Sequence, residues 1–321
     1  MADDGSSESI DSLRFAPLGV DAVAHRVVHG GERFHDAVVV DDAVERELAA
    51  LAELAPLHNR PALDALADAR RDFPDIPHVA VFDTAFHATI PAEAATYAVP
   101  QVWRDEWGIR RFGFHGLSVE WSAHRVPVPR LVVCHLGGGC SVTAVRDSRS
   151  VDTTMGFSPL EGVPMATRSG SIDPAVVLHL LRTKRVGVEE IERALESESG
   201  LLGISGESSR VEELEASGSA AAALALAVFA HRIAGAVAAM ASTLGGLDAI
   251  AFTGGTGERS SRVRVDVCSR LSFLGCTLEE RANEAAAPDA VVSADDSAIA
   301  VHVIRAREDV VAADAARRLL S

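Results

Sequence analysis

Lysine is almost absent from this sequence of 321 residues, and Lys184 is its single example. Basic residues number only 30, against 46 acidic residues, which gives a net charge of −16. A nucleic-acid-binding surface needs a concentrated basic patch, so this balance argues against a nucleic-acid partner. It does not exclude a phosphorylated small ligand, because a few arginines can gather inside an acidic protein.

The sequence contains only four cysteines, which are Cys134, Cys140, Cys268 and Cys276. No C-x-x-C pair and no zinc-like spacing of cysteine and histidine occurs, so we predict buried, reduced thiols in a cytoplasmic protein. The first residues, MADDGSSES, are acidic and polar, unlike a signal peptide. The apolar stretch 219–240 is interrupted by His231 and Arg232, so we expect no membrane span.

Several enzyme signatures are also missing. The sequence has no G-x-S-x-G elbow, no H-E-x-x-H helix and no G-x-x-x-x-G-K-[ST] loop. These absences argue against the hydrolases, metalloproteases and P-loop nucleotide hydrolases that use them. The glycines of CHLGGG do not form a dinucleotide fingerprint either, because the next segment has the pattern of a strand rather than a helix.

Hydrophobic periodicity predicts strands alternating with helices, which is typical of an α/β protein. We expect strands at AVAHRVVHGG, HVAVFDT, RLVVCHL, SVTAVRD, DAIAFT and AIAVHVIRA. A long alanine-rich helix is predicted over roughly 219–243, and another from about Glu308. Asp41 or Asp42 could cap a helix that ends near residue 54, and Pro61 suits the first turn of the next one.

Polar and glycine residues gather where the predicted strands end. The segments AHRVVHGGE, VFDTAFH, RRFGFHG and MATRSGSIDP concentrate arginine, histidine and aspartate, and CHLGGGCS and FTGGTGE are glycine-rich turns. Glycine lets backbone amides approach an anion closely, and arginine offers a planar fork for a carboxylate or phosphate. These residues predict a site for anions that uses neither a cysteine nucleophile nor zinc.

Nine segments of the sequence resemble those of acetate kinases, in the same order. They are HRVVHGGE, APLHN, VFDTAFH, IRRFGFHG, CHLGGG, VDTTMGFSPLEG, TRSGSIDP, SGLLGISGESS and FTGGTGE. The resemblance implies the two-domain, actin-like (ribonuclease H-like) fold of the acetate and sugar kinase, heat-shock ATPase and actin superfamily. It also implies direct phosphoryl transfer between ATP and a short carboxylate with Mg²⁺ or Mn²⁺, in a homodimer.

The resemblance also implies a role for individual residues. Arg26 would bind the substrate carboxylate, Asp83 would orient the acetate or the metal, and Glu308 would hold the metal through water. His115 and Arg168 would stabilise the phosphoryl group in flight. The methyl pocket would consist of Val28, Leu57, Phe114 and Pro159. The nucleotide would contact His135, Gly137, Gly138, Gly139, Gly255 and Gly257.

The sequence departs from the acetate-kinase pattern in two regions. The family's opening strand and N-A-G-S-S-S-L-K-type turn have no counterpart in the few residues before Arg26, so the resemblance implies an incomplete first domain. On the nucleotide side, Gly138 and Arg259 stand where the family has asparagines, and Arg210, Val211 and Glu212 replace its adenosine-binding residues. We expect a disordered tail over 1–13, a first-domain remnant over 14–84, a nucleotide-binding and dimerisation domain over 85–308, and a helix over 309–321 that could return to the first domain.

Two functions remain open from the sequence. The first is an active acetate or short-chain carboxylate kinase that converts ATP and acetate to acetyl phosphate and ADP. The second is a catalytically impaired relative that binds an acyl phosphate, a carboxylate or a protein partner. The set of Arg26, Asp83, His115 and Arg168 favours the first, and the altered nucleotide side favours the second.

Overall fold

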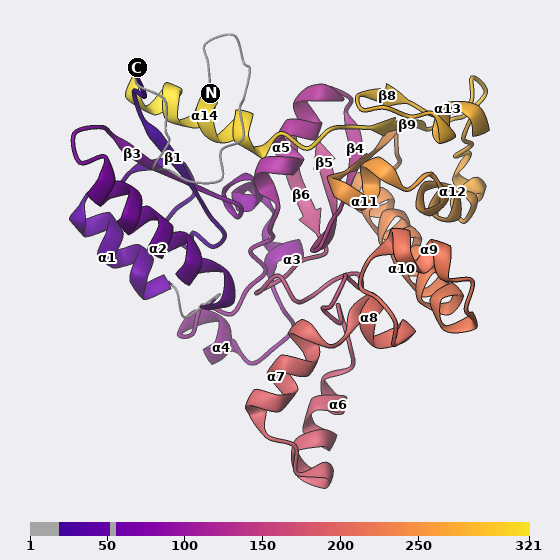
Figure 1. Cartoon of the computed structure of the whole chain (residues 1–321), viewed down its shortest axis with the longest axis horizontal. Coiled ribbons are helices and arrows are strands. Elements are labelled where there is room, and N and C mark those ends of the chain that lie inside the picture. Colours follow the sequence, from indigo (N-terminus) through magenta and orange to yellow (C-terminus); the bar gives the residue numbers. More distant parts are fainter. Residues whose placement is uncertain (1–18, 52–55) are drawn as a thin grey trace.

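The structure, a computed structural model, describes the backbone of residues 19–51 and 56–321 (Figure 1). Side chains are described for the same residues except 56–58. The tail predicted over 1–13 and the side chain of Leu57 therefore lie outside the described part. The helices, in chain order, are α1 (Asp42–Leu51), α2 (Pro56–Asp72), η3 (Ala85–Thr89), α3 (Ala92–Ala95), α4 (Gln101–Asp105), α5 (Gly116–Arg125), α6 (Pro174–His179), η4 (Leu180–Lys184), α7 (Val188–Ser197), α8 (Gly200–Ser205), α9 (Val211–Ser217), α10 (Ala220–Leu244), α11 (Gly254–Arg259), α12 (Ser261–Ser269), η5 (Ser272–Leu274), α13 (Glu280–Glu284) and α14 (Glu308–Leu320).

The described strands form two sheets, which confirms the predicted α/β class. The smaller sheet has the order β1-β3-β2 and consists of β1 (Val23–Val27), β2 (Val38–Val39) and β3 (His78–Phe82). The larger has the order β6-β5-β4-β7-β9-β8 and consists of β4 (Arg130–Leu136), β5 (Cys140–Arg146), β6 (Arg149–Thr153), β7 (Ala249–Thr253), β8 (Ala290–Val291) and β9 (Ala300–Val303). Parallel pairing joins β1 to β3, β4 to β7 and β7 to β9.

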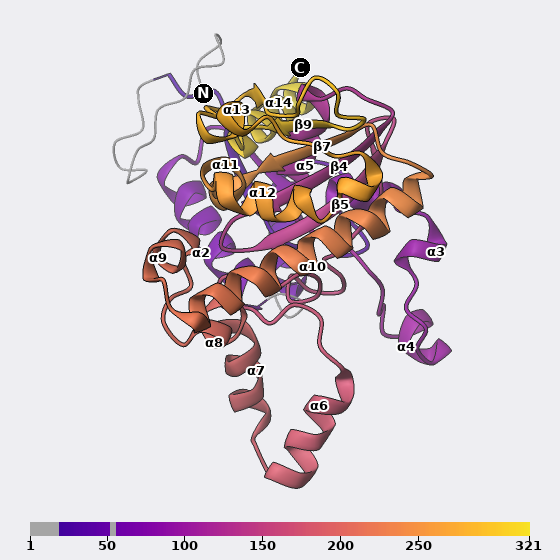
Figure 2. The ribbon, with the colours of Figure 1, turned by 90° about the vertical axis from the view of Figure 1, so that its right-hand side faces the viewer.

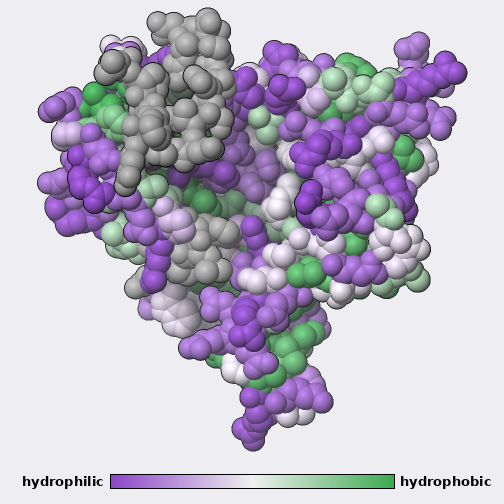
Figure 3. Space-filling model, in the orientation of Figure 1, coloured by the Kyte–Doolittle hydropathy of each residue, from purple (hydrophilic) through white to green (hydrophobic). Residues whose placement is uncertain are grey.

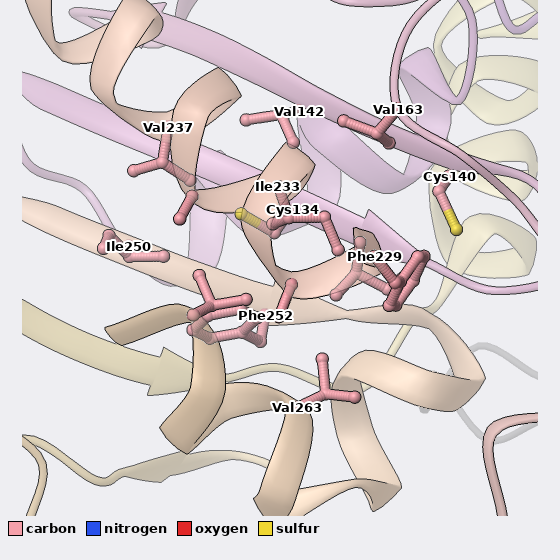
Figure 4. Packing of buried hydrophobic residues seen from close by; sticks show 14 of the residues in the cluster. Cys134, Cys140, Val142, Val163, Phe229, Ile233, Val237, Ile250, Phe252 and Val263 are labelled. Carbon is pink, nitrogen blue, oxygen red and sulfur yellow. The ribbon is translucent and has the colours of Figure 1, made fainter. Parts of the chain in front are cut away.

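The central strand β4 is buried on both faces, which explains its continuous apolar run RLVVCHL. Val132, Cys134 and Leu136 belong to the main core with α10, whereas Leu131 and Val133 pack with residues of α5. Figure 2 shows α10 lying along one face of this sheet, and Figure 4 shows its side chains packed against the strands. Because side chains alternate along a strand, His135 shares the face of Leu131 and Val133, toward α5.

Helix α10 is long and apolar enough, by composition, to cross a membrane. His231 and Arg232, which interrupt this apolar stretch in the sequence, are both exposed in the structure. A stripe of α10 that includes Phe229, Ile233 and Val237 is buried in the main core. Packing against the sheet therefore accounts for the apolar composition of α10.

The smaller sheet is covered on one face by α1 and α2 and on the other by α14 (Figure 1). Val27, Ala80 and Phe82 pack with Leu48 and Leu66 of the first two helices. Val79 and Val81, on the opposite face, pack with residues of α14 that include Val311 and Ala312. Helix α14 thus joins the end of the larger sheet to the smaller one. The division into domains at residues 84 and 308 stays a prediction.

The expected start of α2 is wrong. The sequence predicts Pro61 in the first turn, but α2 begins at Pro56 and includes Pro61 in its interior. The turn before Pro61 has a tertiary anchor, because the buried Asn59 side chain accepts from His29 N at 3.1 Å and donates to His29 O at 3.2 Å. Such an anchor can hold a helical turn that proline by itself disfavours, and local sequence does not reveal it.

Candidate active site

A cavity of about 570 Å³ lies where the ends of the two sheets meet the start of α14. Its lining comes from the end of β1, the residue before α5, the end of β4 and the turn after it, the loop after β6, α11, and the start of α14. The lining residues are Arg26, Val28, His115, His135, Gly139, Arg168, Gly254, Gly255, Glu258, Ala306, Glu308 and Asp309. The fold therefore brings together eight of the residues that the sequence predicted for one site.

Arg26 lies between two carboxylates, Asp83 and Glu308, that are far apart in the sequence. Its Nε and Nη2 donate to Oδ1 and Oδ2 of Asp83 at 2.8 and 2.6 Å, and Nη1 lies 2.9 Å from Oε2 of Glu308. Burial acts to lower the pKa of Arg26, but Asp83 and Glu308 outweigh it and the pKa is raised. Since a guanidinium has five N–H donors, these contacts leave donors on the terminal nitrogens for a bound carboxylate.

The register of the smaller sheet determines where Arg26 and Asp83 lie relative to Glu308. Arg26 pairs with Val81 in the parallel β1–β3 ladder, so its side chain lies on the face that α14 covers. Asp83 follows β3 directly and is 1% exposed. Burial raises the pKa of Glu308, Arg26 lowers it in part, and Asp83 and Asp309 add to the increase. The surroundings of Glu308 thus favour protonation of its carboxylate or the binding of a cation beside it.

His115 and His135 form a stacked pair at the cavity wall. Their ring centroids are 4.1 Å apart with an angle of 25° between the planes. His115 has a left-handed backbone (φ 61°) at the start of α5, where Gly116 N donates to Asp83 O at 2.8 Å. Burial first, then His135 and the two arginines of the site, hold the pKa of His115 well below its usual value. Burial also lowers the pKa of His135 to about 4, so both rings are neutral at pH 7.

Arg168 approaches the cavity from the loop after β6. Its Nη1 donates to the carbonyl of Pro159 at 2.8 Å, and its Nε lies 4.0 Å from Oε2 of Glu196. A Cβ built on Gly139 would lie 3.1 Å from Nε2 of His115 and 3.3 Å from Nη2 of Arg168. The glycine turn, the histidine pair and Arg168 thus converge at one point, where an anion would find donors from several sides.

Some predicted residues support the cavity without lining it. Phe114 is 1% exposed and Pro159 is buried, and Pro159 acts through its carbonyl. Within the described part of the chain, Gly137, Gly138 and Gly257 are not among the lining residues. Gly257 is buried near Phe252, whereas Gly254, Gly255 and Glu258 are the residues of α11 that line the cavity. The expected approach of Gly257 to a nucleotide stays a prediction.

Several residues that border the cavity are not among those that the sequence predicts. Gly254, Glu258, Ala306 and Asp309 line it beside the predicted residues. Ser118 and Ser141, both fully buried, lie behind it and bond the rings of His135 and His115 at 2.8 and 3.0 Å. The signal that could have indicated the serines is that each lies two residues after a motif, GFHG for Ser118 and CHLGGG for Ser141.

Two of the departures on the nucleotide side contact each other. Arg259 stands in α11 and Glu212 in α9, and Nη2 of Arg259 lies 3.0 Å from Oε1 of Glu212. A Cβ built on Gly255, which lines the cavity, would lie 3.0 Å from Nη2 of Arg259. An ion pair therefore borders the glycine end of the cavity.

Neutral buried histidines make the stability depend on pH. The pKa values of His25, His29, His87 and His135 are each lowered to about 4, with burial as the main cause. Between about pH 6.5 and 4 the unfolded chain takes up protons at these positions and the folded chain does not. The free energy of unfolding should therefore fall as the pH falls through this window, by up to about 1.4 kcal/mol per pH unit for each histidine.

Urea unfolding at pH 7, 6 and 5 would measure this slope. We expect His87→Gln to reduce the slope, whatever it does to the stability at pH 7. His231→Gln, at an exposed position of α10, should keep the slope of the parent protein. A free energy of unfolding that stays constant between pH 7 and 5 would contradict the prediction.

Comparison with known proteins gives consistent results. A sequence model of the Acetokinase family matches residues 11–314. The acetate kinase of Nostoc punctiforme is 43% identical over 317 residues, which cover 95% of this chain and 77% of that relative. The acetate kinase of Leifsonia xyli subsp. xyli is 46% identical over 301 residues, which cover 90% and 76%.

Solved structures agree with the sequences. The acetate kinase of Porphyromonas gingivalis superposes with a TM-score of 0.88 at 33% identity, covering 97% of this chain and 80% of that one. The propionate kinase of Francisella tularensis superposes with a TM-score of 0.87 at 37% identity, covering 92% and 78%. The predicted actin-like fold is confirmed by this agreement. Together with the family match over almost the whole sequence, these similarities show that the chain belongs to the acetokinase family.

Proposed function

We propose that the protein is an acetate or short-chain carboxylate kinase, which transfers a phosphoryl group reversibly between ATP and the carboxylate. The products are an acyl phosphate, acetyl phosphate for acetate, and ADP. The observation that carries the proposal is the convergence of Arg26, His115, His135 and Arg168 on one cavity. Membership of the acetokinase family supports it.

The chemistry needs few protein groups. Phosphoryl transfer depends on in-line positioning and on neutralising the equatorial oxygens rather than on a covalent intermediate. We propose that Arg26 holds the carboxylate through its remaining N–H donors and that Arg168 and His115 contact the phosphoryl oxygens. A carboxylate is already a nucleophile at pH 7, so this site needs no general base.

The cavity residues also fit a divalent cation. Mg²⁺ in phosphoryl-transfer sites uses one or two carboxylates and completes its shell with phosphate oxygens and water. Asp83 and Glu308 supply two carboxylates that meet at Arg26. The described residues contain no group of three or more His, Cys, Asp or Glu side chains that could hold a metal. We therefore propose that the ion binds together with the nucleotide, and it would neutralise phosphate charge when bound.

The experiment is an assay of acetyl phosphate, trapped as hydroxamate, with ATP, Mg²⁺ and acetate. We expect product that depends on all three. No product above that of an Arg168→Ala variant would contradict the kinase proposal. Propionate and butyrate in place of acetate would then give the preferred chain length.

The binding-only alternative has one observation in its favour, which is the ion pair of Arg259 and Glu212 beside Gly255. Calorimetric titration with acetyl phosphate and with ATP separates the two functions. Binding of acetyl phosphate without ATP binding and without turnover would favour the alternative. Binding of both, with turnover, would exclude it.

The glycine turn provides a matched pair of variants. A Cβ at Gly139 would contact His115 and Arg168, whereas a Cβ at Gly138 meets no atom within 4 Å. We expect Gly139→Ala to lower kcat/KM for acetate about 10²-fold, because small displacements of reacting groups are costly. Gly138→Ala should stay within about twofold of the parent protein. Equal effects of the two variants would contradict the placement of the site.

We also propose a homodimer in the cytoplasm. Ile172, Val176 and Leu178 are exposed apolar residues at or near α6, and Figure 3 shows hydrophobic side chains gathered on this projecting part. Such a patch is typical of a protein–protein contact. The four cysteines are free and buried, which suits a reducing compartment. Light scattering of the parent protein and of a Val176→Asp variant would test the dimer.

A further inference from the structure

Three histidines in and behind the active site share one type of contact. In each case a serine hydroxyl lies within hydrogen-bond distance of the ring atom Nδ1. The pairs are Ser150 with His87 at 2.8 Å, Ser141 with His115 at 3.0 Å, and Ser118 with His135 at 2.8 Å. All three serines are 0% exposed. A hydroxyl can donate to Nδ1 or accept from it, so the contact alone does not fix where the ring proton lies.

The pair of Ser150 and His87 can be resolved from its surroundings. Nε2 of His87 lies 2.9 Å from the carbonyl oxygen of Phe114, and a carbonyl only accepts. Nε2 of His87 must therefore carry a proton. Because burial lowers the pKa of His87 to about 4, the ring is neutral and has no second proton. Nδ1 is thus an acceptor, and Ser150 is the donor.

In the two pairs at the cavity, the direction of the hydrogen bond follows from the serine, because its buried hydroxyl hydrogen requires an acceptor. A buried hydroxyl hydrogen without an acceptor costs free energy, whereas an unused hydroxyl lone pair costs less. Among the residues that the structure describes, the imidazole is the hydrogen-bond partner of the hydroxyl in both Ser118 and Ser141. If Nδ1 carried the proton, each hydroxyl hydrogen would lack an acceptor. Both serines therefore donate to Nδ1, and both imidazoles carry their proton on Nε2.

The protonated edges face the ligand side. A Cβ on Gly139 would lie 3.1 Å from Nε2 of His115, and a Cβ on Gly137 would lie 3.5 Å from Nε2 of His135. Both histidines line the cavity. The rings are stacked at 4.1 Å, so a positive charge on one opposes a positive charge on the other. Two donors side by side need a proton on Nε2 of each ring, and the charge repulsion favours two neutral rings of the same tautomer over a charged one.

We propose that Ser118 and Ser141 are positioning residues that hold His135 and His115 in the Nε2–H tautomer. The cavity wall then presents two neutral N–H donors to the oxygens of a bound anion and leaves the positive charge to Arg26 and Arg168. The register of β4 and β5 builds this arrangement, since His135 pairs with Ser141 across the hairpin. The identification of the anion as a transferring phosphoryl group rests on the proposed function. The assignment of the tautomers rests on the serine contacts and is independent of that function.

The first experiment is ¹⁵N NMR of the full-length protein labelled at histidine, at pH 7, with long-range correlations from ring carbons to both ring nitrogens. His87 serves as an internal reference, because its Nε2–H tautomer follows from an independent contact. We expect His115 and His135 to show the same pattern as His87. An Nδ1–H pattern or a doubly protonated ring at either position would overturn the proposal. The result does not depend on turnover, so it stands apart from the kinase assay.

The second experiment separates positioning from simple packing. We expect Ser141→Ala and Ser118→Ala each to lower kcat about tenfold, with little change in KM for acetate. Without the serine hydroxyl, the imidazole can adopt another orientation or tautomer, and its Nε2–H no longer points at the ligand. Ser141→Thr, which keeps the hydroxyl, should recover at least half of the lost rate. Ser122→Ala is the control, because its hydroxyl bonds the backbone of Ser118 and no histidine. Full activity in both alanine variants would overturn the positioning role, as would equal losses in Ser141→Ala and Ser141→Thr with both folded.

Discussion

Replacing Arg168 by alanine should lower kcat for acetyl phosphate formation by about 10³-fold and leave KM for acetate nearly unchanged. A single donor to developing charge is typically worth 10² to 10³ in rate, and an arginine at a phosphoryl group is worth still more. Arg168 is held for this task by the carbonyl of Pro159 and converges with His115 on Gly139. The measurement is steady-state kinetics with hydroxamate detection at saturating ATP and Mg²⁺.

Two further variants make this result specific. Arg168→Lys keeps the charge but loses the planar fork, so we expect an activity between those of Arg168→Ala and the parent protein. Arg270→Ala removes an exposed arginine at the end of α12 and should have no effect. Retention of more than about a tenth of the parent kcat in Arg168→Ala would be incompatible with a role at the phosphoryl group.

Replacing Arg26 by alanine should affect both stability and carboxylate binding. The change leaves Asp83, which is 1% exposed, without its bidentate partner. A broken buried pair costs 3–5 kcal/mol, but the side chain of Arg26 is 42% exposed, so we expect about 2 kcal/mol. kcat/KM for acetate should fall on the order of 10²-fold, mainly through KM, because acetate loses the guanidinium that binds it.

The double variant Arg26→Ala/Asp83→Asn separates the two effects. It removes the unpaired buried charge, so urea unfolding should show a stability closer to that of the parent protein. Carboxylate binding should not recover, because the guanidinium is still missing. If the double variant regained acetate affinity, Arg26 would have only a structural role.

Much of the fold could be predicted because its signals are long and regular. The strand RLVVCHL and the alanine-rich helix were placed within a residue or two of their observed bounds, β4 at Arg130–Leu136 and α10 at Ala220–Leu244. The start of α2 could not be predicted, because the turn before Pro61 has an anchor, the contact of Asn59 with His29, that comes from a distant segment. Local propensity contains no such information.

The candidate site could be predicted in its membership but less in its geometry. The resemblance to acetate kinases predicts Arg26, Asp83 and Glu308 as site residues. The contact of Arg26 with Glu308, however, depends on how α14 packs on the smaller sheet. Ser118 and Ser141 could not be predicted because serine is common, and their contacts depend on how α5 packs on β4 and on the register of β4 and β5. The contact of Gly257 with a nucleotide stays a prediction from the motif FTGGTGE, and in the structure Gly257 is buried near Phe252.

The position of α14 has a consequence for how the protein is made. Glu308 contacts Arg26, and the helix that follows covers the face of β1 and β3, which the ribosome synthesises early. Contacts between such distant positions form late, since the intervening loop must close first. A folding intermediate that has formed the larger sheet but has not docked α14 could not bind its carboxylate ligand in the final geometry. Competence for ligand binding should therefore appear only after α14 has packed on the smaller sheet.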